Sequence, residues 1–82
     1  MMIDHLPMHA HVALLEDVQT THCESGVPLL LRRGDAGTIV MTYDDGAYEV
    51  EFSDHSGRAY AILPLSADQL LVLRDVPEHV SE

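Results

Sequence analysis

Polar and apolar residues alternate most strictly in residues 46–53, a segment that begins at a turn glycine and leads into a second turn. Because successive side chains of a β-strand point to opposite faces, the tyrosine, valine and phenylalanine of this segment share one face. Glu49 and Glu51 share the other face. The pattern predicts a half-buried antiparallel strand with an apolar inner side and an acidic outer side.

Shorter apolar runs, separated by turn residues, predict four further strands. The pair Asp45-Gly46 is typical of a tight hairpin turn, and Ser66 is a suitable cap for one short helical turn before the last strand. We therefore expect five short strands, at residues 11–15, 36–43, 47–53, 58–63 and 70–73.

A chain of 82 residues supports one domain with a small core. We expect a β domain at residues 11–74, preceded by a flexible lead (residues 1–10) and followed by a flexible tail (residues 75–82). No apolar run approaches the roughly 18 residues needed to span a membrane, and the N-terminal residues lack the pattern of a signal peptide. The expected location is the cytoplasm, with no membrane partner.

The connection between the first two strands is long and carries three consecutive leucines, at positions 29, 30 and 31. Three neighbouring side chains in an extended segment cannot all point inward. At least one, for which we take Leu30, is therefore available to a partner or to a second copy of the chain, and homo-oligomerisation is left open. The alternative is that the surplus leucine covers an open end of the domain.

Three separated blocks carry a family resemblance: RGDAGTIV (residues 33–40), DGAYEVEF (residues 45–52) and ADQL (residues 67–70). Together they resemble a group of small bacterial proteins known only as a domain of unknown function. The first block also resembles the glycine-containing strand of KOW-type barrels and of a group of small SH3-like proteins of the photosystem I reaction centre. The resemblance implies an all-β fold, a small five-stranded SH3-like barrel with a short helical turn before the last strand. It implies no activity and no catalytic residues.

The charge balance favours one class of partner. Four arginines and no lysine stand against fourteen carboxylates, so the formal net charge is −10. Such a field repels polyanions, which excludes nucleic acid as the expected ligand, and attracts basic proteins. The alternative is that the acidic surface only keeps the domain soluble.

The sequence therefore predicts a non-catalytic protein-interaction module, in one form an inhibitor or antitoxin-like partner of a basic protein. The predicted contact residues are outward carboxylates of the alternating strand, carboxylates of the flanking turns and one exposed leucine. They are Glu49, Glu51, Asp44, Asp45, Asp54 and Leu30.

Candidate chemistry is sparse, and we expect neither an enzyme nor a cofactor. Cys23 is the single cysteine, and no nucleophile has a base at a useful spacing. Histidine is in excess, and His9 and His11 would share one face if the first strand reached back that far. With His5 they form the alternative hypothesis of a metal site, against the simpler interpretation of a histidine-rich lead.

Overall fold

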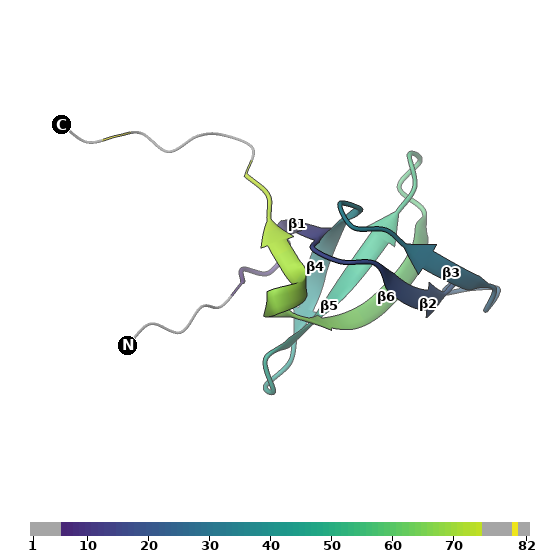
Figure 1. Cartoon of the computed structure of the whole chain (residues 1–82), viewed down its shortest axis with the longest axis horizontal. Coiled ribbons are helices and arrows are strands. Elements are labelled where there is room, and N and C mark those ends of the chain that lie inside the picture. Colours follow the sequence, from purple (N-terminus) through teal and green to yellow (C-terminus); the bar gives the residue numbers. More distant parts are fainter. Residues whose placement is uncertain (1–5, 75–79, 81–82) are drawn as a thin grey trace.

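A computed structural model of the chain describes residues 6–74 and 80. Seven strands and one short 3-10 turn make up the regular structure of these residues (Figure 1). In chain order they are β1 (His11–Leu14), β2 (Val18–Thr21), β3 (Pro28–Leu31), β4 (Ala36–Thr42), β5 (Ala47–Ser53), β6 (Ala59–Ser66), η1 (Ala67–Gln69) and β7 (Leu70–Val72). The described part of the chain has no helix long and apolar enough to cross a membrane.

Five of the strands form one antiparallel sheet in the order β6-β5-β4-β1-β7. The predicted alternation of β5 is confirmed: Tyr48, Val50 and Phe52 are buried, whereas Glu49 and Glu51 lie on the opposite face. The inner face of the sheet holds the core, in which the largest fully buried side chains are Phe52, Ile39, Val12 and Val50.

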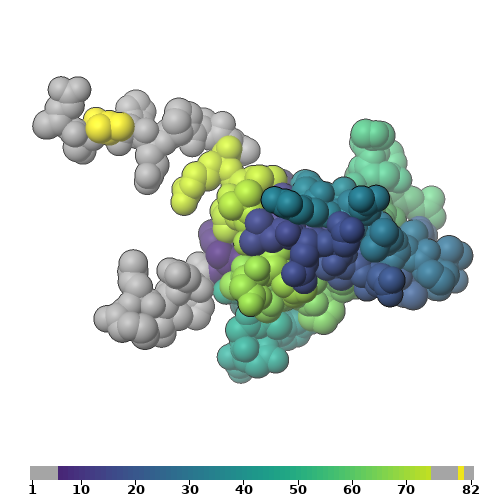
Figure 2. Space-filling view, in the orientation of Figure 1, coloured from purple at the N-terminus to yellow at the C-terminus, as the bar shows by residue number. Residues whose placement is uncertain are grey.

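The other two strands, β2 and β3, form a hairpin that lies over the sheet (Figures 1 and 2). Leu31 is buried in the core, and Val18 and Leu29 pack against it. At the hairpin tip the backbone N–H of Cys23 donates to the carbonyl oxygen of Tyr60 at 2.9 Å, which ties the hairpin to β6. The hairpin therefore supplies part of the core.

The sequence-based expectation of five strands is corrected by the structure, which has seven strands in two open sheets within the described residues. The five expected strands are present as β1, β4, β5, β6 and β7, and η1 confirms the predicted helical turn. The long connection expected between the first two strands contains β2 and β3. Their inward residues alternate, but each strand has only four residues, which is short for a periodic signal.

Strand β6 continues through Pro64, beyond the predicted end at residue 63. Proline lacks the N–H group of a sheet ladder and is tolerated where that side of the strand has no neighbour. Because β6 is the outermost strand of the five, Pro64 can pair with Glu49 in β5 without breaking a ladder on its other side.

Residues 6–10, which the sequence analysis placed in the N-terminal lead, contact the sheet. The N–H of His9 donates to the carbonyl oxygen of Ile39 at 2.8 Å, and the N–H of Ile39 donates to the carbonyl oxygen of Ala10 at 3.0 Å. The N–H of Leu6 donates to the hydroxyl oxygen of Tyr48 at 3.1 Å. The remaining residues of the lead, 1–5, and most of the predicted tail lie outside the described residues.

Candidate functional site

The outer face of β4, β5 and β6 brings carboxylates and exposed apolar side chains together. In the strand register Glu51 lies between Thr38 and Ile62. Directly opposed side chains of neighbouring strands have Cβ atoms about 4.5–5.5 Å apart. The aliphatic side chain of Ile62, which is 41% exposed, therefore adjoins a carboxylate.

The second row of this surface repeats the combination. Glu49 lies between Met41 and Pro64, and the side chain of Met41 is 50% exposed. The hydroxyl of Tyr43 donates a hydrogen bond to Oε1 of Glu49 at 2.9 Å. We call this surface the mixed face and define it by Met41, Tyr43, Glu49, Glu51 and Ile62.

The hydrogen bond between Tyr43 and Glu49 favours the protonated form of the phenol. Donation to a carboxylate stabilises that form, so the bond to Glu49 raises the pKa of Tyr43 above its ordinary value, with smaller contributions from desolvation and from the charges of Glu49 and Asp45. The phenol stays neutral, and Tyr43, which is 40% exposed, holds it beside the carboxylate. Such a combination suits a basic side chain with an aliphatic stem.

The turn carboxylates have a different role. Asp45 accepts a hydrogen bond from the N–H of Ala47 at 3.1 Å within the β4–β5 turn. In the β5–β6 turn Oδ1 of Asp54 accepts hydrogen bonds from the hydroxyl of Ser56 and from the backbone N–H groups of Ser56 and Arg58. These bonds, led by that of the Ser56 hydroxyl, lower the pKa of Asp54. Both aspartates stabilise their turns.

The predicted acidic residues consequently do not form one compact cluster. The β4–β5 turn, with Asp44 and Asp45, and the β5–β6 turn, with Asp54, project from opposite ends of β5 (Figure 1). A strand of this length spans about 20 Å. Glu49 and Glu51 are the members that share a surface, and Asp44 and Asp45 border it at one end only.

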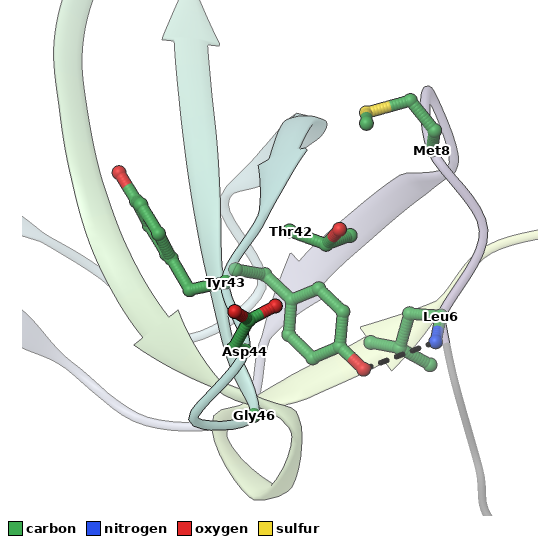
Figure 3. A pocket seen from close by; sticks show the side chains of 7 residues that line it. Leu6, Met8, Thr42, Tyr43, Asp44 and Gly46 are labelled. Carbon is green, nitrogen blue, oxygen red and sulfur yellow. Dashed lines mark hydrogen bonds between the residues drawn. The ribbon is translucent and has the colours of Figure 1, made fainter.

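A cleft of about 450 Å³ opens between the N-terminal segment and the β4–β5 turn (Figure 3). Leu6 and Met8 line it from one side, and Tyr43 and Asp44 from the other. The hydroxyl oxygen of Tyr48 accepts a hydrogen bond from the N–H of Leu6 at 3.1 Å. The side chain of Tyr43 points away from Leu6 and Met8 (Figure 3). The cleft therefore adjoins the mixed face at Tyr43.

Leu30 lies on a separate element, the outer side of the β2–β3 hairpin, where it is 52% exposed. A shallower hollow of about 340 Å³ lies beside it, with Gln19, Thr20 and Pro28 in its lining. The adjacent Leu31 is 2% exposed. Leu30 thus adds an isolated apolar contact that is not part of the mixed face.

The predicted metal ligands are only partly described. His5 lies outside the described residues, and His9 occupies a turn with φ of 68° rather than an extension of β1. Nδ1 of His11 lies 3.3 Å from the hydroxyl of Thr38. Within residues 6–74 and 80 no three His, Cys, Asp or Glu side chains are grouped closely enough to hold a metal ion. The strand alternation on which the pairing of His9 with His11 depended does not extend to His9.

Sequence reasoning missed the apolar members of the mixed face. An uninterrupted alternation from Thr38 would turn Met41 towards the core, but the register shifts between Ile39 and Met41. This irregularity of the β-bulge type inserts one residue and places Met41 opposite Glu49. Ile62 was detectable, because its spacing from buried Ala61 already placed it on the outer side.

A comparison with protein families places residues 8–72 in a family described as Domain of unknown function (DUF4926). The matched range contains every strand from β1 to β7, together with the mixed face. No curated protein and no solved structure matches the chain. The resemblance to a small domain of unknown function is confirmed, and the chain belongs to the DUF4926 family.

Proposed function

We propose that this chain is a non-catalytic protein-interaction module that binds a basic protein through the mixed face. The observation that carries the proposal is the placement of Glu49 and Glu51 among exposed Met41, Tyr43 and Ile62. Protein interfaces are enriched in methionine and aromatic residues, and surrounding charges select the partner. A polar surface that served only solubility would not need exposed apolar side chains at its centre.

The distribution of positive charge supports a basic partner. Arg32 pairs with Asp17 at 3.5 Å and Arg58 pairs with Glu24 at 3.1 Å, both away from the mixed face. Its five defining residues include no cation. With a formal net charge of −10, the chain attracts a positively charged protein over distances of about 8–10 Å and repels nucleic acid.

One concrete form of the proposal is an inhibitor or antitoxin-like protein that covers a positively charged site of its partner in the cytoplasm. An acidic surface with fixed carboxylates can occupy a site that normally holds phosphate groups. In this form the chain needs no catalytic residue of its own, because its effect is to exclude the partner's ligand.

We further propose that the fold is an SH3-like barrel in which the β2–β3 hairpin closes the open side of the five-stranded sheet. The sheet order β6-β5-β4-β1-β7, the 3-10 turn before β7 and the bond between Cys23 and Tyr60 support it. An experimental structure tests this arrangement. A hairpin that stands away from the sheet, with Leu31 in solvent, would contradict it.

The binding proposal is tested with the product of an adjacent gene of basic composition. We expect it to co-purify with the chain and to lose at least tenfold in affinity between about 0.05 and about 0.5 M salt. The double variant Glu49→Gln with Glu51→Gln should weaken binding about tenfold or more, since two charged contacts are lost.

The matched control is Glu24→Gln with Asp68→Asn, which removes two charges from the hairpin tip and from η1. This control should change the affinity by less than about threefold. Equal losses in both double variants would show that only net charge matters. Absence of binding, or binding insensitive to salt, contradicts the proposed function.

A further inference from the structure

The cleft beside the β4–β5 turn combines the surfaces that a long basic side chain requires. Leu6 and Met8 provide an apolar wall, and Tyr48, which is 4% exposed, lies beneath them at the edge of the core. Asp44 lines the cleft with a carboxylate. Its volume of about 450 Å³ falls in the range of small-ligand sites, about 300–1,000 Å³.

The carboxylate of Asp44 is the polar group of the cleft that is available to an incoming donor. Asp44 takes part in neither of the two ion pairs found between described residues. The hydroxyl oxygen of Tyr48, a residue that is 4% exposed, already accepts a hydrogen bond from the N–H of Leu6 at 3.1 Å. No arginine, lysine or histidine lines the cleft among the described residues, so its local charge is negative.

We propose that this cleft binds an arginine side chain of the basic protein partner. The aliphatic part of the arginine would lie against Leu6 and Met8, and its guanidinium group would donate to the carboxylate of Asp44. Arginine fits better than lysine because its planar group forms paired hydrogen bonds with a carboxylate. Arginine is also enriched among the residues that dominate interface energies.

Tyr43 connects this cleft to the mixed face. Tyr43 is one of the residues that line the cleft, and its hydroxyl donates to Glu49 at 2.9 Å. A partner segment that crosses Glu49 and Glu51 can therefore place one arginine in the cleft while its other basic residues meet the mixed face. The inference rests on the proposed function and adds the identity and position of the anchoring side chain.

The test is a titration of the isotope-labelled full chain with short peptides, followed by NMR of the backbone amides. The probes are acetyl-Gly-Arg-Gly-amide and the same peptide with citrulline, which keeps the shape of arginine and lacks its charge. We expect the arginine peptide to shift the amides of residues 6–8 and 42–46, and the citrulline peptide to bind at least tenfold more weakly.

Asp44→Asn should lower the affinity for the arginine peptide about tenfold, since a charge-assisted hydrogen bond is lost. Asp45→Asn is the matched control, because it makes the same change of charge one residue away, outside the cleft lining, and keeps an oxygen that can accept from Ala47. Its affinity for the arginine peptide should change less than about twofold.

Equal binding of the arginine and citrulline peptides, or equal losses in the two variants, would overturn the cleft assignment. This failure is distinguishable from that of the proposed function. The basic protein could still bind in a manner that depends on Glu49 and Glu51 while Asp44→Asn has no effect. That result would support binding through the mixed face and contradict arginine binding in the cleft.

Discussion

Gly37 in β4 and Val50 in β5 approach each other so closely that no larger residue fits at position 37. A Cβ atom on Gly37 would lie 2.8 Å from Cγ1 of Val50 and 2.9 Å from the carbonyl oxygen of Glu51. Atoms at such distances overlap, and the second contact is with backbone held in the sheet. The second glycine of the RGDAGTIV block, Gly37, thus permits β4 and β5 to pack over the core.

Gly37→Ala should therefore destabilise the protein by about 1–3 kcal/mol, because the added methyl group forces the two strands apart. Urea unfolding followed by circular dichroism measures the change. Ala36→Ser serves as a control, since Ala36 is the exposed neighbour in the same strand and the change should stay within about 0.5 kcal/mol. A Gly37→Ala protein as stable as the unmodified chain would contradict the close approach.

The adjacent leucines of β3 provide a test of the hairpin. Leu31 is 2% exposed in the core, whereas Leu30 is 52% exposed on the outer side. Leu31→Ala should cost about 2–4 kcal/mol through the lost burial and the cavity left behind, and Leu30→Ala should cost less than about 0.5 kcal/mol. Chemical unfolding of both variants checks this difference. Similar costs would mean that the hairpin is not anchored to the sheet.

Asp54 should make stability depend on pH. Its pKa is lowered in the folded chain, first by the hydroxyl of Ser56 and then by the N–H of Arg58. A lowered folded pKa means that its contribution is fully present above the unfolded pKa of about 4 and is lost as pH falls through the folded value. Asp54→Asn should therefore be less stable than the unmodified chain at neutral pH, with the difference shrinking below about pH 4.

Urea midpoints of both proteins between about pH 2 and about pH 7 measure this dependence. Asp44→Asn is the control, because it removes the same charge without the turn hydrogen bonds of Asp54, and it should not destabilise at neutral pH. A constant difference between Asp54→Asn and the unmodified chain at every pH would show that the carboxylate charge does not stabilise the turn.

The sequence predicts the parts of this fold whose patterns are long. The seven alternating residues of β5 and the position of the turn before them were identified correctly, because side-chain parity and turn chemistry are local properties. Of the pair Asp45-Gly46, only Gly46 has the positive φ of a two-residue hairpin turn. Strands β2 and β3 were missed for the opposite reason. Their inward residues are defined by packing on the sheet, and four-residue strands separated by a turn do not carry enough periods to show it.

The same distinction applies to the candidate site. Glu49 and Glu51 were placed on the outer face from parity alone, and the structure places them there. The placement of Met41 beside them depends on cross-strand register, which the irregularity after Ile39 shifts by one residue. The cleft depends on the contact between Leu6 and Tyr48, which are 42 positions apart in the sequence, so no local pattern predicts it.

The hydrogen bond between Tyr43 and Glu49 offers a direct probe of the mixed face. Glu49→Gln should lower the pKa of Tyr43 towards its ordinary value of about 10, because the acceptor that stabilises the protonated phenol loses its charge. The pKa of Tyr60 is also raised, mainly by burial, so the ring signals must be followed individually by NMR during an alkaline titration.

Glu51→Gln is the matched control: it removes an equal charge from the same strand face but not the bonded carboxylate, and should lower the pKa of Tyr43 less. Equal effects of the two variants would show that the pKa of Tyr43 responds to the net negative charge of the mixed face and not to a hydrogen bond with Glu49. That result would contradict the hydrogen bond by which Tyr43 connects the mixed face to the cleft.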